Sequence, residues 1–321
     1  MILTLTANPS IDRTTTVKGR LERGGVYRLA MQSDVPGGKG VNVSAAVANA
    51  GHDTLALYPA ANNGRFSRLL AETNIPHEAI DLPDEARVNL TIVEDDGTTT
   101  KLNTPGALLS QADADRILER LSHHAPGASW VVLAGSLPPG VPVDFWATCV
   151  RAVRDANPDA GIAVDTSDAP LLALGEAFPA SAPEVMKPNG LELGQLAGLD
   201  GVELEKRAAA GDLAPVVAAA RRLNDSGVGE VLVTLGAAGA VLVLSDAPAL
   251  AATPPPIVPL STVGAGDSSL AGYQLAREDG LDAAGALARA VAYGSAATSL
   301  PGTTIPRPDQ TNPGDVVVRE I

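Results

Sequence analysis

The sequence predicts an α/β protein, in which a mainly parallel β-sheet carries helices on both faces and a second, smaller sheet stands apart. Of the 321 residues, 45% are hydrophobic and only 3% are aromatic, a composition typical of a sheet buried between helices. Short apolar runs alternate with segments of helical periodicity, which indicates right-handed βαβ crossovers. Two stretches with polar alternation interrupt this rhythm and predict the smaller sheet.

Strands of the main sheet are expected where short apolar runs end at turn residues, and helices are expected at the amphipathic segments between them. The expected strands are Ile2–Ala7, Thr54–Pro59, Trp130–Ala134, Gly161–Asp165, Val185–Lys187 and Val231–Leu235. The expected helices are Val41–Ala50, Arg65–Thr73, Gln111–His123, Val143–Ala156, Leu191–Ala197 and Ala214–Ser226. Ala240–Leu244 and the proline-rich Thr253–Val258 are expected as edge strands, since proline cannot donate to a central ladder.

The smaller sheet is expected within residues 12–34 and 86–104. Thr14–Gln32 and Ala86–Asn103 show polar alternation, and Asp95-Asp96-Gly97 predicts a hairpin in the second stretch. Neither stretch has a helix of its own, so these strands should project from the main body as a lid. Such a lid could close over a site or pair with another subunit. We therefore expect one domain over residues 1–321, with the lid as part of it.

Charge, cysteine and histidine content exclude several classes of function. A formal net charge of −14 disfavours nucleic acid and anionic membranes as partners. The single cysteine, Cys149, rules out an internal disulfide, and the four histidines lack metal-ligand spacing. No segment resembles a secretion signal or a membrane span, so a cytoplasmic protein is expected. An acidic protein that binds phosphate must concentrate its positive charge, which singles out Lys39, Arg87 and Lys187.

A glycine-rich helix start with one carboxylate lies near the C-terminal end, at Gly264-Ala265-Gly266-Asp267. Backbone N–H groups without side-chain bulk at a helix N-terminus bind anions, and the helix dipole adds partial positive charge. A carboxylate here weakens the attraction for phosphate, so it indicates a chemical role, to accept a proton from an alcohol that attacks phosphorus. Asp267 could equally cap backbone donors, and this segment alone leaves both roles open.

A second glycine-rich helix start, Pro36-Gly37-Gly38-Lys39-Gly40, favours the chemical role. One such turn is often structural, but one basic and one acidic example in a single chain indicate two anionic ligands. Neither matches the common nucleotide motifs, because no GxxxxGK[ST] occurs and Ser269 stands where a dinucleotide fingerprint has its third glycine. A P-loop enzyme and a dinucleotide-dependent oxidoreductase are therefore disfavoured.

Six motifs resemble, in order and spacing, those of the ribokinase-like carbohydrate kinases and, within them, the phosphofructokinase B branch. They are Asn8-Pro9-Ser10-Ile11-Asp12, Gly37-Gly38-Lys39-Gly40-Val41-Asn42, Gly135-Ser136-Leu137-Pro138, Lys187-Pro188-Asn189-Gly190-Leu191-Glu192, Thr234-Leu235-Gly236 and Gly264-Ala265-Gly266-Asp267. Within the branch, the motifs look most like those of the bacterial 1-phosphofructokinases. The resemblance implies a three-layer ribokinase-like α/β/α core, ATP-dependent phosphorylation of a sugar, and Mg²⁺ as cofactor.

The resemblance also implies a catalytic base and a nucleotide groove. Asp267 would take the proton from the acceptor hydroxyl, and Glu192 would hold Mg²⁺ through water. The anion hole for the transferred phosphoryl group would be formed by Gly264, Ala265 and Gly266. ATP would be bound by Lys187, Asn189, Thr234, Gly236, Gly264, Gly266, Gly294 and Ser295. Asn189 with Glu192 three residues later equally fits a helix cap.

On the sugar side, the resemblance implies contacts from both glycine-rich loops and the lid. The sugar hydroxyls would be bound by Asp12, Gly38 and Asn42, although an Asx turn explains Asp12 equally well. The phosphate already on the sugar would be held by Lys39, Arg87 and Ser136, with Asn89 as a further polar contact.

The lysine in the Gly37–Gly40 loop indicates which phosphosugar is bound. A glycine-only loop resembles that of the branch's 6-phosphofructokinases, whose basic lid residue falls near the uncharged Gly25 of this chain. The resemblance therefore favours D-fructose 1-phosphate, phosphorylated at the hydroxyl of carbon 6 to give fructose 1,6-bisphosphate. Tagatose 6-phosphate and fructose 6-phosphate are the alternatives within the branch, and a non-catalytic phosphosugar sensor is the alternative outside it. A homodimer formed through the lid is also implied.

Overall fold

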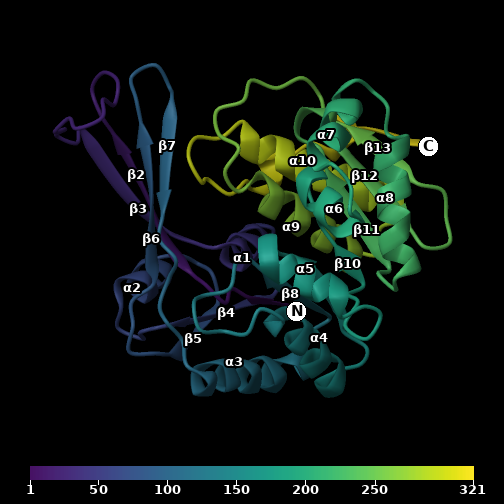
Figure 1. Cartoon of the computed structure of the whole chain (residues 1–321), viewed down its shortest axis with the longest axis horizontal. Helices are drawn as coiled ribbons and strands as arrows, with labels where there is room; N and C mark the ends of the chain where they lie inside the picture. Colours follow the sequence, from purple (N-terminus) through teal and green to yellow (C-terminus); the bar gives the residue numbers. More distant parts are fainter.

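A ten-stranded sheet forms the centre of the computed structural model, which describes all 321 residues. Helices cover both faces of this sheet, and a separate four-stranded sheet projects from one end (Figure 1). The predicted α/β/α layering with a smaller second sheet is confirmed. None of the helices combines the length and the apolar character needed to span a bilayer.

The large sheet has the strand order β14-β13-β12-β11-β10-β9-β8-β1-β4-β5. Neighbouring strands are parallel from β5 to β11 and antiparallel from β11 to β14. The strands are β1 Ile2–Leu5, β4 Thr54–Ala60, β5 His77–Asp81, β8 Trp130–Ala134, β9 Gly161–Asp165, β10 Val185–Met186, β11 Glu230–Thr234, β12 Ala240–Leu244, β13 Leu250–Thr253 and β14 Val317–Glu320. Because parallel strands share one carboxyl edge, residues that follow β1, β8, β9 and β10 come together there.

Two helical layers bury opposite faces of this sheet. The first layer contains α1 Lys39–Asn49, α9 Ala265–Glu278 and α10 Ala283–Thr298. The second contains α3 Gln111–His124, α4 Phe145–Ala156, α5 Asp168–Glu176, α6 Gly190–Ala197, α7 Gly201–Ala209 and α8 Ala214–Asp225. Alternation along each strand divides the core, so that Ile2 packs with the first layer and Leu3 with the second. Short 3₁₀ turns lie at Ala125–Gly127, Gly236–Ala238, Pro308–Gln310 and Pro313–Asp315.

The projecting sheet, which we call the lid, has the order β3-β2-β6-β7. Its strands are β2 Ser10–Thr16, β3 Met31–Gly37, β6 Arg87–Val93 and β7 Thr99–Asn103. The predicted hairpin is present, since β6 and β7 pair antiparallel around residues 94–98. Helix α2 (Arg65–Ala71) packs at the base of the lid, where Ile11 of β2 shares a small core with Phe66.

The structure corrects the bounds of two predicted stretches and adds elements that the sequence analysis does not identify. The last predicted edge strand is Leu250–Thr253 rather than Thr253–Val258, because prolines at 254–256 leave no N–H groups to pair. The first lid strands are Ser10–Thr16 and Met31–Gly37, so most of Thr14–Gln32 is the loop between them. The sequence analysis does not identify β5, β14, α5 and α7. Strand β14 pairs with β13, a contact that no local pattern of its four residues indicates.

Candidate active site

Asp267 is a buried carboxylate in the first turn of α9. Gly264 precedes the helix with φ of 77°, a left-handed conformation that favours glycine and turns the chain into α9. The Asp267 Oδ2 atom accepts a hydrogen bond of 2.8 Å from Nδ2 of Asn42 in α1. Burial raises the pKa of Asp267, and it remains raised although the Lys39 ammonium lowers it. Asp267 is thus a better proton acceptor than an exposed aspartate.

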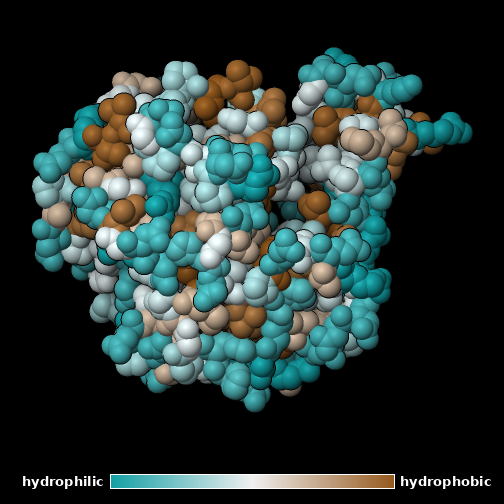
Figure 2. All heavy atoms as spheres, turned by 180° about the vertical axis from the view of Figure 1, so that it is seen from behind, coloured by the Kyte–Doolittle hydropathy of each residue, from teal (hydrophilic) through white to brown (hydrophobic).

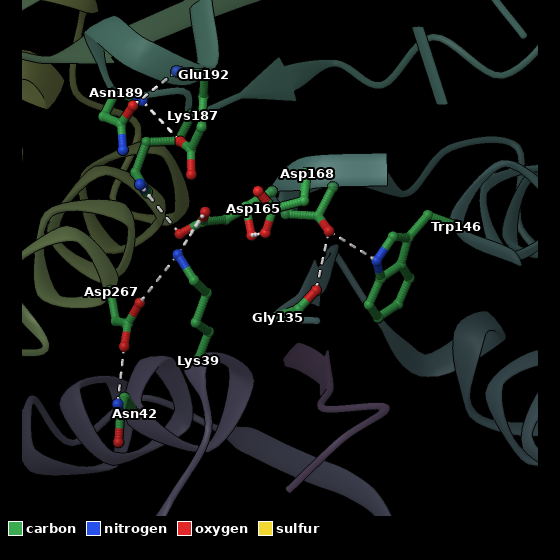
Figure 3. Close-up of polar contacts among 12 residues, drawn as sticks. Lys39, Asn42, Gly135, Trp146, Asp165, Asp168, Lys187, Asn189, Glu192 and Asp267 are labelled. Atoms are coloured by element: carbon green, nitrogen blue, oxygen red, sulfur yellow. Dashed lines mark hydrogen bonds and ion pairs between the residues drawn. The ribbon is translucent and has the colours of Figure 1, made fainter. Parts of the chain in front are cut away.

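A second carboxylate, Asp165, lies between two lysines beside Asp267. Its Oδ1 is 2.9 Å from Nζ of Lys39 and its Oδ2 is 3.0 Å from Nζ of Lys187. Nζ of Lys39 is also 4.0 Å from Oδ1 of Asp267, and Figure 3 shows this side chain pointing between the two carboxylates. We call these four residues the lysine–carboxylate cluster.

Mutual pairing favours the charged forms of Asp165 and Lys39 within the lysine–carboxylate cluster. Burial opposes ionisation of Asp165, but the ammonium groups of Lys187 and Lys39 hold its pKa below the usual value. Burial likewise opposes the charge on Lys39, but Asp165 and Asp267 together raise its pKa. Positive and negative groups therefore alternate at this edge of the sheet before any ligand binds.

A cavity of about 680 Å³ opens beside the lysine–carboxylate cluster, large enough for a nucleotide. Its walls come from the start of α9, from α10 and from the proline-rich segment after β13. The residues expected on the nucleotide side that line it are Lys187, Asn189, Glu192, Thr234, Gly236, Ala265, Gly266, Gly294 and Ser295. Segments that are far apart in the sequence thus line one cavity.

Asn189 and Glu192 form a capping box at the start of α6. The Asn189 Oδ1 atom accepts from the Glu192 N–H, and the Glu192 Oε2 atom accepts from the Asn189 N–H, both at 2.8 Å. Burial and the nearby Asp165 raise the pKa of Glu192. The capping interpretation is therefore correct, and Glu192 nevertheless lines the cavity.

The sugar-side residues of the lid lie next to one another at its base. Asp12 and Asn89 are direct neighbours on β2 and β6, and Asn89 Nδ2 donates to Asp12 Oδ1 at 3.2 Å. Arg87 Nη2 donates to Ser136 Oγ at 3.2 Å, and both residues line a hollow of about 400 Å³. Nε of Arg87 and Oδ1 of Asn89 are buried and have no hydrogen-bond partner in the protein.

Two residues predicted to contact the sugar have side-chain partners within the protein in this structure. Lys39, expected beside Arg87 and Ser136, lies in the lysine–carboxylate cluster, because it opens α1 and reaches the carboxyl end of β9. Asn42, expected on a sugar hydroxyl, donates instead to the carboxylate of Asp267. Gly38, with φ of 116°, forms the turn before α1.

Asp165 is the site residue that the sequence analysis does not identify. It ends the predicted strand Gly161–Asp165, and a carboxylate at a strand end is a weak signal by itself. Its two partners come from α1 and from the segment after β10, so only the assembled sheet reveals its position.

The site combines a buried carboxylate at a glycine-rich helix start, lysines beside it and a nucleotide-sized cavity at the carboxyl edge of a parallel sheet. This arrangement is typical of kinases that phosphorylate an alcohol. Comparison with known proteins agrees with this class. Residues 5–310 match the pfkB family of carbohydrate kinases, and the chain belongs to that family.

Individual relatives cover almost the whole chain. It is 38% identical over 313 residues to a 1-phosphofructokinase of Rhodobacter capsulatus, covering 96% of this chain and 94% of the relative. It is 32% identical over 314 residues to the ATP-dependent 6-phosphofructokinase isozyme 2 of Escherichia coli K12, covering 97% and 96%. The crystal structure of phosphofructokinase-2 from Escherichia coli with substrates and products superposes with a TM-score of 0.83 at 30% identity, covering 96% of each chain. The ribokinase-like fold and a transferase function in carbohydrate metabolism are thereby established.

Proposed function

We propose that residues 1–321 act as one kinase domain that transfers a phosphoryl group from ATP to the carbon-6 hydroxyl of D-fructose 1-phosphate. The products are fructose 1,6-bisphosphate and ADP. The observation that carries this proposal is the buried Asp267 carboxylate, whose pKa is raised and which lies beside the nucleotide-sized cavity. A phosphosugar sensor would gain nothing from a proton acceptor in an anion site.

Asp267 would accept the hydroxyl proton as the sugar oxygen attacks the terminal phosphorus. The N–H groups of Ala265 and Gly266, at the start of α9, would donate to the oxygens of the transferred group. Gly266 supports this role, because a Cβ atom added there would lie 3.2 Å from Nζ of Lys187. Without that atom, the backbone N–H groups and the Lys187 ammonium group could contact the same anion. Lys39, next to Asp267, would neutralise charge on the same phosphoryl group.

Arg87 and Ser136 would hold the phosphate on carbon 1, with Asp12 and Asn89 on the sugar hydroxyls. The unpartnered Nε of Arg87 and Oδ1 of Asn89 support this assignment, since a phosphosugar supplies both an acceptor and donors. Gly37 supports the role of Asp12, because an added Cβ would lie 2.3 Å from the Asp12 carboxylate. Only glycine therefore leaves room for that carboxylate at the base of the lid.

Magnesium fits the nucleotide side of this site. No group of three or more His, Cys, Asp and Glu side chains could hold a metal ion by itself, so the ion would be bound mainly through ATP phosphates. The cap on α6 uses Oε2 of Glu192, which leaves Oε1 to hold a water ligand of the metal. When bound, Mg²⁺ supplies positive charge to the phosphate oxygens.

The second candidate is phosphorylation of fructose 6-phosphate, favoured by the similarity to the 6-phosphofructokinase isozyme of Escherichia coli. Tagatose 6-phosphate is the third. An ADP-release assay with fructose 1-phosphate, fructose 6-phosphate, tagatose 6-phosphate and ribose distinguishes them. We expect the highest kcat/KM for fructose 1-phosphate. A higher kcat/KM for another sugar would make that sugar the assigned substrate. No turnover with any of the four sugars would favour the non-catalytic phosphosugar sensor.

The lid also supports a homodimer. Its face away from Asp12 carries an apolar row on β6, and Leu102 of β7, directly opposite Leu90, is 54% exposed. Figure 2 shows apolar atoms among polar ones on this projection, at the upper right. A second lid would cover the row by a self-complementary, two-fold contact.

Leu102→Glu should therefore give a monomer in light scattering, with lower activity because Arg87 and Asn89 belong to the same sheet. Thr99→Glu is the matched control, since Thr99 lies on the same strand but on the opposite face. A fully active wild-type monomer at assay concentration would contradict the dimer and its link to catalysis.

A further inference from the structure

One buried hydroxyl joins the turn that carries Ser136 to the end of β9. Thr166 directly follows Asp165 and is 2% exposed. Its Oγ1 donates a hydrogen bond of 3.0 Å to the carbonyl oxygen of Gly135, and Nε1 of Trp146 donates to the same hydroxyl oxygen at 3.1 Å (Figure 3). Gly135 has φ of 104°, so this carbonyl lies at the point where the chain turns out of β8.

Trp146 fixes the direction of the Thr166 hydroxyl. An indole N–H can only donate, so the hydroxyl oxygen must accept from Trp146 and give its single proton to Gly135. Trp146 is fully buried in α4, and its ring has no freedom to turn the N–H elsewhere. The carbonyl of Gly135 is thus held by an oriented donor inside the core.

The turn after Gly135 contacts the sugar side of the site through Ser136. Ser136 Oγ accepts from Nη2 of Arg87 and from Nδ2 of Asn8, both at 3.2 Å. Asp165 is held by backbone bonds that do not involve the Thr166 hydroxyl, because it pairs with Ala134 in the sheet and its carbonyl accepts from the Gly135 N–H at 2.8 Å. Loss of the Thr166 hydroxyl would therefore release the Ser136 turn and leave the lysine–carboxylate cluster in place.

We propose that Thr166, oriented by Trp146, is a positioning residue that sets Ser136 and Arg87 for the phosphate on the sugar. The identity of this ligand rests on the proposed function. The positioning of the turn rests on the hydrogen bonds alone.

Thr166→Val tests the proposal, because valine keeps the shape and removes the hydroxyl. We expect KM for the phosphosugar to rise about fivefold to tenfold, as one hydrogen bond allows, with kcat and KM for ATP within about twofold of the wild type. Thr166→Ser should restore KM, and Trp146→Phe should raise it by less than Thr166→Val. Thr54→Val is the matched control, since Thr54 is buried and donates to Ile2 at 2.8 Å at the far end of the sheet.

The path through Ser136 is tested in a double-mutant cycle. In a Ser136→Ala background, Thr166→Val should change the phosphosugar KM by less than about twofold. The proposal would be overturned if the Ser136→Ala and Thr166→Val changes raised the phosphosugar KM independently, so that their factors multiplied in the double variant. It would also be overturned if Thr166→Val left this KM unchanged, or if Thr54→Val raised it equally.

Hydrogen exchange gives a readout that needs no substrate. Peptides covering residues 134–138 should exchange faster in Thr166→Val than in the wild type, Thr166→Ser or Thr54→Val, with the rest of the sheet unchanged. Unchanged exchange in these peptides, or faster exchange throughout the sheet, would overturn the positioning role. If the wild type phosphorylates no sugar in the panel, the proposed function fails and this exchange result still decides the role of Thr166.

Discussion

The lysine–carboxylate cluster and the base of the lid line two different cavities and have opposite physical character. In the cluster, the side chains of Asp165 and Lys187 are 0% and 3% exposed, and each charge already has an opposite charge within 4.0 Å. At the base of the lid, Arg87 and Asn89 are half-buried and each keeps one polar atom without a partner. The charges of the cluster are thus paired with one another, whereas polar atoms at the base of the lid have no partner.

This difference indicates how the two regions divide the work. Charged groups held in place by ion pairs need no rearrangement when the phosphoryl group is transferred. Such preorganised charges are the main source of electrostatic stabilisation of a transition state. Unpartnered donors and acceptors favour the ligand that completes them, so they contribute to selection of the substrate. Substitutions in the cluster should therefore affect stability and kcat, and substitutions in the lid should affect KM for the sugar.

The largest effect is expected from Asp165→Asn, which leaves the buried ammonium group of Lys187 and the partly buried one of Lys39 without their shared partner. Removal of one member of a buried ion network costs about 3–5 kcal/mol in the free energy of unfolding, measurable by urea denaturation. Asp34→Asn in the lid loses ion pairs with two arginines, Arg13 and Arg65, whose side chains are 25% and 49% exposed, and should cost less, about 1 kcal/mol. Equal losses in the two variants would remove the contrast between the regions.

Asp267→Asn should lower kcat by at least ~10²-fold and leave KM for both substrates within about threefold. The amide keeps the shape and can no longer accept the hydroxyl proton. Asp225→Asn, an exposed aspartate at the end of α8, is the control and should behave as wild type. A variant at Asp267 that retains most of its turnover would show that another group is the base.

Arg87→Ala should raise KM for the phosphosugar by about tenfold or more, the loss of one charge-assisted contact, with KM for ATP nearly unchanged. Steady-state kinetics with each substrate varied in turn measures both values. Arg20→Ala, in the exposed lid loop, should change neither. If both KM values rise together, the sugar and nucleotide sides of the site have been assigned wrongly.

The smallest effect concerns pH. Because burial raises the pKa of Asp267 and Lys39 lowers it, activity should fall as pH decreases through the pKa of this carboxyl group. Lys39→Met removes the lowering influence, so the acid limb of the kcat profile should move to higher pH. Lys206→Met, on the surface of α7, should leave the limb in place. An unmoved limb in Lys39→Met would mean that a different group controls it.

The sequence by itself determined the local parts of this protein. Alternation of apolar runs and helical segments predicted the layered fold, and polar alternation with Asp95-Asp96-Gly97 predicted the β6–β7 hairpin. The two glycine-rich helix starts drew attention to Lys39 and Asp267. Glycines at a helix N-terminus indicate an anion-binding site, and this pattern is visible in a few consecutive residues. Each of these features depends on contacts within a few residues.

Only the tertiary structure decided which of these parts meet. Asn42 and Asp267 are 225 positions apart and share a hydrogen bond, and Lys39 pairs with Asp165, which the sequence analysis does not identify. Such contacts follow from the strand order, in which β1 is inserted between β8 and β4, and from the packing of α1 and α9 on one face. Local periodicity specifies that a strand forms but not its neighbours, so Asp165 and its two lysines become visible as one cluster only in the folded chain.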